Sequence, residues 1–221
     1  MSMKSWSEKA FKMGRFDAVV KVGGSIIAGP YAESAAGVLG DAATSSRLLV
    51  IPGGGDIDNL IEEKNRQRAL SRPVFHRATA LAQDQSGLLF TNLHKQLQPI
   101  EAVIDAERVL AEGSVPVLLP SRLLFALDVF RYTNRVSSDT IAAYLAWLLH
   151  VPTVILLKSR EPATRPVTPA SLAEDVGFVD EVFPDFIVES KLRCLFVAPH
   201  EFAALGRYLR GDADVRIATV G

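Results

Sequence analysis

A short apolar segment that ends in two glycines and a serine constrains the fold of this chain more than any other part of the sequence. Residues Ala18–Val22 read Ala-Val-Val-Lys-Val, and Gly23, Gly24 and Ser25 follow directly. Because β-branched residues dominate the segment and glycine ends it, we expect a buried parallel strand. Adjacent glycines leave no Cβ between backbone N–H groups and an anion, and Lys21 adds a compact positive charge. The composition suits a phosphate site, although a Gly-Gly pair after a strand most often forms only a turn.

A second glycine-rich turn follows the next predicted strand. Residues 47–51 are apolar after the first position, and they lead into Pro-Gly-Gly-Gly-Asp at residues 52–56. Consecutive glycines at a strand end are used where a larger residue does not fit or where a ligand approaches the backbone. A flexible loop without a ligand is the alternative. We expect Asp56 to cap a helix that continues to about Leu70.

The rest of the chain alternates helical and strand patterns. This alternation predicts an α/β fold of three αβα layers around a mainly parallel sheet, and the 221 residues favour one domain over residues 1–221. Further helices are expected at 31–39, 74–97, 105–112, 140–149, 183–190 and 201–209, and further strands at 102–104, 116–119, 152–157, 195–198 and 215–220. Residues 162–169 are expected to form a proline-rich loop, and residues 120–130 are apolar without a clear period.

The composition argues against several functional classes. With 24 basic and 25 acidic residues, the net charge of −1 gives no electrostatic case for binding nucleic acid or an anionic membrane surface. Cys194 is the only cysteine and lies in an apolar segment, which disfavours disulfides and cysteine-based metal sites and favours a reducing, cytoplasmic location. No apolar run approaches the length of a membrane span, and the first residues lack the apolar region of a leader peptide.

Two further polar clusters lie at predicted element ends. Ser137, Ser138 and Asp139 precede an almost wholly apolar helix, where their ordinary role is to cap it. An acid at this point can also orient a catalytic lysine. Lys158 and Ser159 directly follow the predicted buried strand at 152–157. Each cluster therefore has both a structural and a functional interpretation.

Taken in order, three of these segments resemble the amino acid kinase superfamily, which includes acetylglutamate, aspartate, carbamate and uridylate kinases. The segments are Lys-Val-Gly-Gly-Ser from Lys21, Pro-Gly-Gly-Gly from Pro52 and Ser-Asp-Thr-Ile-Ala-Ala from Ser138. The predicted helix with Arg77 and Asp84 resembles the helix with which bacterial uridylate kinases face their nucleoside monophosphate. The combination resembles even more closely the small aminomethylfuran phosphate kinase-like proteins of archaea and methylotrophs.

The resemblance implies direct phosphoryl transfer from ATP to an acceptor oxyanion, without a covalent enzyme intermediate. Mg²⁺ would be held mainly by ATP phosphates, with no metal ligands from the protein, and the protein would be a homo-oligomer, a dimer or dimer-based. By analogy, Lys21, Asp139 and Lys158 would be catalytic; Gly23, Gly24, Ser25, Gly55 and Ser159 would bind nucleotide phosphates; and Gly53, Gly54, Arg77, Asp84, Ser137 and Ser138 would bind the acceptor.

The sequence also departs from the family pattern. Many members carry Thr-Asp-Val-Asp-Gly after the strand that corresponds to residues 152–157, whereas this chain has Lys-Ser-Arg-Glu-Pro from Lys158. The Gly-Met-x-x-Lys motif of amino-acid-specific members is missing. We therefore expect a kinase that converts a small phosphate monoester, such as aminomethylfuran phosphate, into a diphosphate. The alternative functions are a non-catalytic anion- or nucleotide-binding member and a uridylate kinase-like enzyme. The alternative for Arg77 and Asp84 is that they are ordinary surface residues of a long helix.

Overall fold

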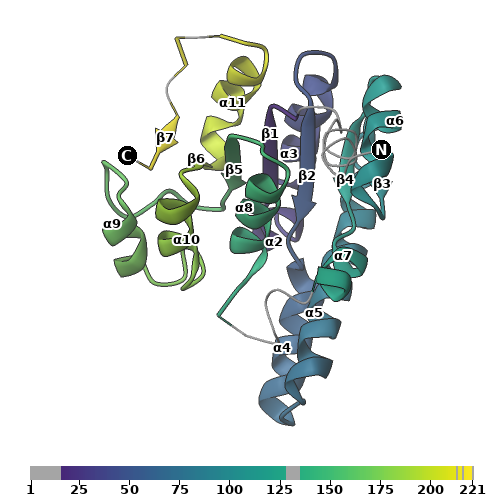
Figure 1. The fold of residues 1–221 in the computed structure, drawn as a ribbon, viewed down its shortest axis with the longest axis vertical. Helices are drawn as coiled ribbons and strands as arrows, with labels where there is room; N and C mark the ends of the chain where they lie inside the picture. The colour runs from purple at the N-terminus through teal and green to yellow at the C-terminus, as the bar shows by residue number, and fades with distance from the viewer. Residues whose placement is uncertain (1–15, 128–134, 213, 216, 221) are drawn as a thin grey trace, which may run out of the picture.

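A single sheet organises the computed structural model, which describes residues 16–127, 135–212, 214–215 and 217–220. The strands follow the order β3-β4-β2-β1-β5-β6-β7, and neighbouring strands are parallel except for β6 and β7 (Figure 1). They are β1 (Ala18–Val22), β2 (Leu48–Pro52), β3 (Leu97–Ile100), β4 (Val115–Leu118), β5 (Thr153–Leu157), β6 (Arg193–Val197) and β7 (Ala218–Thr219). The chain leaves β1 toward β2 on one side and returns to β5 on the other, so the carboxyl ends of these strands flank the crevice where open α/β sheets bind ligands.

Helices cover both faces of the sheet, as the three-layer prediction requires. They are α2 (Gly24–Ile27), α3 (Ala32–Asp41), α4 (Gly55–Gln67), α5 (Arg72–Thr91), α6 (Ala106–Ala111), α7 (Ser121–Leu127), α8 (Ser138–Leu148), α9 (Pro169–Glu174), α10 (Phe183–Ser190) and α11 (Phe202–Leu209), with 3₁₀ turns at Ala42–Thr44, Val103–Asp105 and Pro199–Glu201. One buried cluster joins the sheet to α2, α3 and α11, and another joins it to α6, α8 and α10. Within the described part of the chain, no helix combines the length and apolarity needed to cross a membrane.

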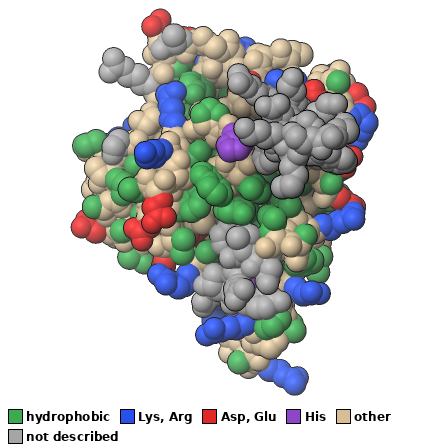
Figure 2. Space-filling model, in the orientation of Figure 1, with side chains coloured by type: hydrophobic (Ala, Val, Ile, Leu, Met, Phe, Trp, Pro, Cys, Tyr) green, Lys and Arg blue, Asp and Glu red, His purple; other side chains and the backbone are tan. Residues whose placement is uncertain are grey.

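The pair α4 and α5 extends beyond the edge of the other elements (Figure 1). Figure 2 shows Lys and Arg side chains around this projecting end, where Lys64, Arg66, Arg68 and Arg72 are exposed. At the opposite end of the pair, α4 starts beside the carboxyl end of β2, and Ser86 of α5 donates a hydrogen bond of 2.6 Å to the Gly54 carbonyl oxygen. The inner ends of the two helices are therefore attached to the glycine turns.

Strand alternation decides which side chains reach the helix α8 face. Val19 in β1 and Val154 and Leu156 in β5 belong to the buried cluster that includes α8. Because side chains in a strand alternate between faces, Lys21 lies on the same face as Val19. Lys158, two residues after Leu156, follows the same parity. The neighbouring strands β1 and β5 thus direct two lysines toward one helix.

The structure confirms most of the expected elements and corrects one region. The predicted strand at 102–104 is wrong, and the edge strand β3 lies at Leu97–Ile100 instead. The helix predicted at 74–97 ends at Thr91 in the structure. The prediction was too long because the leucine pattern of α5 continues into the apolar residues of β3. Pro99 made the strand hard to recognise, but an edge strand tolerates proline because one row of its N–H groups has no partner.

Smaller differences concern the start of α4, the untyped apolar segment at 120–130 and the last strand. Asp56 lies in the first turn of α4 but does not cap it, because the helix already begins at Gly55 and Gly54 is the cap residue. Residues 121–127 of the untyped apolar segment form α7, and residues 128–130 of that segment lie outside the described residues. The predicted last strand is found only at Ala218–Thr219 among the described residues.

The two glycine turns touch one another at the carboxyl ends of β1 and β2. A Cβ on Gly53 would lie 2.5 Å from the Gly24 nitrogen, and a Cβ on Gly24 would lie 2.7 Å from the Gly55 nitrogen. Both distances are shorter than any real Cβ contact, and the obstructing atoms are backbone. Gly55 also adopts a positive φ of 59°, a conformation that favours glycine. Glycine is thus required here for packing, whether or not a ligand binds.

We expect Gly53→Ala to lower the free energy of unfolding by about 1–3 kcal/mol, because the added methyl group forces two backbone segments apart. Gly37→Ala is the matched control: this glycine lies inside α3, and a Cβ added to it would meet nothing within 4 Å. Replacing a helical glycine by alanine should stabilise the protein by about 0.5–1 kcal/mol. Urea titration measures both values, and a neutral Gly53→Ala would contradict the close contact.

Candidate active site

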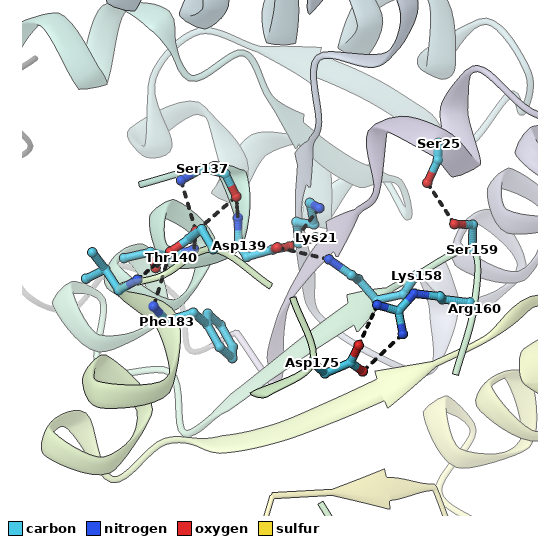
Figure 3. A network of polar contacts seen from close by, with 12 residues as sticks. Lys21, Ser25, Ser137, Asp139, Thr140, Lys158, Ser159, Arg160, Asp175 and Phe183 are labelled. Atoms are coloured by element: carbon cyan, nitrogen blue, oxygen red, sulfur yellow. Dashed lines mark hydrogen bonds and ion pairs between the residues drawn. The ribbon is translucent and has the colours of Figure 1, made fainter. Parts of the chain in front are cut away.

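A carboxylate between two lysines forms the centre of the candidate site. Asp139 Oδ1 lies 2.7 Å from Lys21 Nζ, and Asp139 Oδ2 lies 2.9 Å from Lys158 Nζ. Figure 3 shows the side chains of Lys21 and Lys158 next to the Asp139 carboxylate. The side chains of Lys21, Asp139 and Lys158 are only 6%, 5% and 14% exposed. The three predicted catalytic residues are therefore brought together in one buried group, which we call the triad.

Each member of the triad is held by a different element. Lys21 projects from β1, Lys158 directly follows β5, and Asp139 lies in the first turn of α8. Ser137, not Asp139, caps α8, because its hydroxyl accepts a hydrogen bond from the Asp139 backbone N–H. The Asp139 side chain is consequently free of capping and points at the two lysines.

Asp180, which the sequence analysis missed, fixes the start of α8. Its carboxylate accepts hydrogen bonds from the backbone N–H and hydroxyl of Ser137, both 2.9 Å, and from the backbone N–H and hydroxyl of Thr140, at 3.0 and 2.6 Å. It also accepts from the backbone N–H groups of Val182 and Phe183 at the start of α10. One carboxylate thus joins two helix N-termini and sets the direction in which α8 presents its first turn.

The electrostatics of the triad favour binding an anion. Burial alone would raise the pKa of Asp139, but the charges of Lys21 and Lys158 and their hydrogen bonds outweigh burial and hold the pKa of this carboxyl below its usual value. Burial and the nearby charge of Lys21 lower the pKa of Lys158, against the opposing effect of Asp139. With all three groups ionised, two positive charges and one negative charge leave one buried positive charge without a counter-ion in the triad.

The glycine turns beside the triad form a pocket of about 390 Å³, which we call the glycine pocket. Its lining includes Gly24, Ser25, Gly54, Gly55, Asp58 and Ser138. Helix α4 begins at Gly55, so the positive end of its dipole faces the pocket. Ser25 donates a hydrogen bond of 3.0 Å to Ser159, which connects the β1 turn to the segment after β5.

Two of the predicted glycines use their N–H groups inside the sheet. The Gly23 N–H donates to the Leu157 carbonyl oxygen at 3.0 Å, and the Gly53 N–H donates to the Val22 carbonyl oxygen at 2.8 Å. These bonds extend the parallel pairing of β1 with its neighbours. The assignment of Gly23 to a phosphate contact stays a prediction. Without any ligand, the Gly23 N–H already has a hydrogen-bond acceptor in the sheet.

A smaller pocket of about 130 Å³ adjoins the glycine pocket, and we call it the α4–α5 pocket. Its lining includes Gly54, Asp58, His76, Gln83, Ser137 and Ser138. Gly54, Asp58 and Ser138 line both pockets. The structure therefore places Gly54, Ser137 and Ser138, three predicted acceptor residues, around one cavity.

The other two predicted acceptor residues on α5 are engaged elsewhere. Asp84 accepts hydrogen bonds from the backbone N–H and the hydroxyl of Ser121 at the start of α7. Arg77 lies over the ring of Phe125 with its guanidinium carbon 5.1 Å from the ring centre. Neither residue lines the α4–α5 pocket. Their role in acceptor binding stays a prediction, and the present contacts give both a structural role between α5 and α7.

Asp58 is a pocket residue that the sequence analysis missed. Burial, followed by the charge of Glu62, raises the pKa of Asp58 to about 6, and its Oδ1 atom is buried without a hydrogen-bond partner among the described residues. The signal was present in the sequence, since Asp58 lies within the first turn of α4, four residues before Glu62 on the same helix face.

Comparison with known proteins agrees with this geometry. The parallel sheet with the triad and glycine pocket at its carboxyl edge defines an αβα protein suited to a phosphate-bearing ligand. The profile of a family described as the amino acid kinase family matches residues 18–161. The chain therefore belongs to the amino acid kinase family.

Curated and solved relatives extend over nearly the whole chain. A [5-(aminomethyl)furan-3-yl]methyl phosphate kinase from Methanocaldococcus jannaschii is 22% identical over 213 residues, which cover 92% of this chain and 97% of that protein. The uridylate kinase from Archaeoglobus fulgidus has a similar fold, with a TM-score of 0.65, 15% identity, and coverage of 92% and 98% of the two chains. The aspartate kinase from Synechocystis has a TM-score of 0.64 and 15% identity, over 92% of this chain and 40% of its own. All three are named as kinases, so the predicted phosphotransferase class is confirmed at the level of the family.

Asp139→Asn should lower the free energy of unfolding at pH 7 by about 3 kcal/mol, because it leaves two buried ammonium groups facing each other without a counter-ion. Glu107→Gln is the control: the Arg47–Glu107 pair has the same 2.7 Å separation, but its side chains are 40% and 59% exposed. We expect a loss below about 1 kcal/mol there. Urea titration compares the two variants, and equal losses would contradict a buried electrostatic role for Asp139.

Asp58→Asn should stabilise the protein above pH 6 but not near pH 4. The folded-state pKa of about 6 lies above the ordinary value of 3.8, so the stability of the native protein falls as the pH rises between these values. The asparagine variant avoids this loss and should gain about 1–2 kcal/mol at pH 8, an amount reduced by solvent screening. Melting temperatures of both proteins at pH 4 and pH 8 measure the difference, and a constant difference across this range would contradict the raised pKa.

Proposed function

We propose that this protein transfers the γ-phosphoryl group of ATP to the phosphate group of a small phosphate monoester. In this reaction the bond between the γ-phosphorus and the bridging oxygen of ADP breaks, and a new bond forms between that phosphorus and an acceptor phosphate oxygen. The products are ADP and a diphosphate. The observation that carries the proposal is the buried triad, whose extra positive charge lies beside a pocket formed by two glycine turns.

The glycine turns and the two lysines suit the phosphates of a nucleotide, whose metal ion would be held mainly by those phosphates. When bound, Mg-ATP supplies the transferable phosphoryl group, and the metal neutralises part of the phosphate charge. Lys21 and Lys158 stabilise the negative charge that spreads over the transferring group, because their ammonium groups are held in a site with little water. Asp139 positions both lysines by pairing with each of them. The amides at the start of α4 and the turn at Gly24 position phosphate oxygens.

Two observations favour a small acceptor. The α4–α5 pocket holds about 130 Å³, below the roughly 300–1,000 Å³ that is usual for larger ligands, so it suits a small ring better than a nucleoside. The Methanocaldococcus jannaschii relative is named for a phosphate monoester on an aminomethyl-substituted furan. We therefore propose aminomethylfuran phosphate as the first acceptor to test. A uridylate kinase-like activity remains the alternative for a larger acceptor.

A non-catalytic anion-binding role is the second candidate. The observation that favours it is the segment after β5, which departs from the pattern of many family members. There Lys158 joins the triad, and Arg160 pairs with Asp175 at 2.7 Å. A phosphate or nucleotide held without transfer would use the same positive charge.

The expected homo-oligomer and cytoplasmic location also stay proposals. The outer surface of α5 leaves Leu81, Leu88 and Leu89 exposed, at 46%, 48% and 65%, at positions that share one helix face. Such a row of leucines supports self-association, which would cover it.

Lys21→Met should reduce kcat by roughly 100- to 1,000-fold, about 3–4 kcal/mol, because it removes one preorganised charge from the transition state. The substitution leaves Asp139 paired with Lys158, so we expect the protein to remain folded. ADP release is measured with Mg-ATP and a panel of aminomethylfuran phosphate, UMP, acetylglutamate and aspartate. Lys95→Ala, at an exposed position, is the control and should retain the wild-type rate.

Three outcomes of this panel decide between the candidates. Turnover of a phosphate monoester that depends on Lys21 supports the proposal. Preferential turnover of acetylglutamate or aspartate would sink it. Thermal stabilisation by Mg-ATP without turnover of any acceptor would favour the anion-binding alternative, since a ligand at about 100 times its Kd raises stability by about 2.7 kcal/mol.

A further inference from the structure

The α4–α5 pocket contains hydrogen-bond acceptors that have no donor within the described protein. Asp58 Oδ1 and Gln83 Oε1 are both buried without a hydrogen-bond partner among the described residues. Gln83 is only 7% exposed, and both residues line this pocket. Because an unsatisfied buried acceptor is costly, such atoms in a pocket indicate a ligand that supplies donors.

Carboxylates dominate the ionisable groups around the pocket. Its described lining contains the carboxylates of Asp58 and Glu62 but neither lysine nor arginine, and His76 is its one basic side chain. The raised pKa of Asp58 has the same origin, since burial and the charge of Glu62 both disfavour its ionised form. A phosphate group would be repelled here, whereas a cation would stabilise the ionised form of the buried Asp58 carboxylate.

We propose that Asp58 and Gln83 bind a primary ammonium group on the acceptor substrate and so select acceptors that carry both an amine and a phosphate. An ammonium group offers three N–H donors, which suits two acceptor side chains that approach from adjacent helices. A neutral hydroxyl offers only one donor and does not compensate the carboxylate. The inference rests on the proposed kinase function and adds the chemical class of its acceptor.

The two pockets can hold the two ends of one such molecule. Asp58 lines the α4–α5 pocket and also the glycine pocket, together with Gly54 and Ser138. The glycine pocket is also lined by the carboxylates of Asp56 and Asp58, but the start of α4 lies at its wall. We assign the phosphate end to this pocket because the two lysines of the triad lie beside it. An acceptor with its ammonium group at Asp58 would therefore direct its phosphate toward the glycine turns, where the phosphoryl group arrives. Asp58 would act as a specificity-determining residue and not as a participant in bond formation.

The test compares matched acceptors on matched variants. The acceptors are [5-(aminomethyl)furan-3-yl]methyl phosphate and the same phosphate with a methyl group in place of the aminomethyl group. The proteins are the wild type, Asp58→Asn, Gln83→Met and the control Glu63→Gln, which removes a carboxylate from α4 whose side chain is 47% exposed and does not line the pocket. Circular dichroism establishes that each variant is folded. ADP release gives kcat/KM, and calorimetry gives binding of each acceptor without turnover.

We expect the wild type to prefer the amine by about 100-fold in kcat/KM, because the methyl analogue leaves two buried acceptors unpaired. Asp58→Asn should lower this preference to less than about 10-fold, mainly through the amine substrate, whereas Glu63→Gln should leave it unchanged. Gln83→Met should give an intermediate loss.

The outcomes separate this inference from the kinase proposal. Equal turnover of both acceptors by the wild type, or an unchanged preference in Asp58→Asn, overturns the inference but leaves the kinase function intact. If neither acceptor is turned over, calorimetry decides: amine binding that requires Asp58 supports the inference although the kinase proposal fails for these acceptors. Equal or absent binding of the two compounds overturns it.

Discussion

The carboxylate of Asp139, held between Lys21 and Lys158, is the interaction on which the site depends. Two buried lysines repel one another, and each would be destabilised by burial without a counter-ion. Asp139 makes their proximity tolerable, and it can do so only because β1 and β5 are neighbours and α8 crosses the same face. The order of the strands is thus a precondition of the triad. The triad itself has one positive charge in excess, partly offset by the nearby carboxylate of Asp180, and this excess favours an anionic ligand.

Much of this site could be predicted from the sequence, but the relative positions of its residues could not. The apolar segment before Lys21 and the glycines after it predicted a strand end followed by a turn of the kind that binds phosphate. Side-chain alternation within a strand could place Lys21 and Lys158 relative to their own neighbours. That they face each other follows only from the pairing of β1 with β5, which are separated by more than a hundred residues and which no local pattern connects.

The features that the sequence analysis missed also depend mainly on contacts between distant parts of the chain. Asp180 fixes α8 through Ser137 and Thr140, which lie 43 and 40 residues earlier, so its role depends on tertiary contacts. β3 was displaced in the prediction because Pro99 interrupts the strand pattern of residues 97–100 and the leucine pattern of α5 runs into it. The glycines illustrate a different limit: the Gly23 N–H is used by the sheet, and Gly24 and Gly53 are required by contact between two turns. A motif that resembles a phosphate-binding turn therefore contains glycines that the packing of the protein itself requires.

The charge distribution connects the triad to the pocket beside it. The triad has an excess of positive charge, whereas the α4–α5 pocket has two carboxylates and unpaired acceptors. These opposite charges do not neutralise one another directly, because Asp58 makes no ion pair with Lys21 or Lys158 in the structure. A ligand with separated charges would satisfy both regions at once, whereas a simple anion would satisfy only the triad. Since each uncompensated buried charge is costly, the arrangement supports the proposal of an acceptor that carries both an ammonium and a phosphate group.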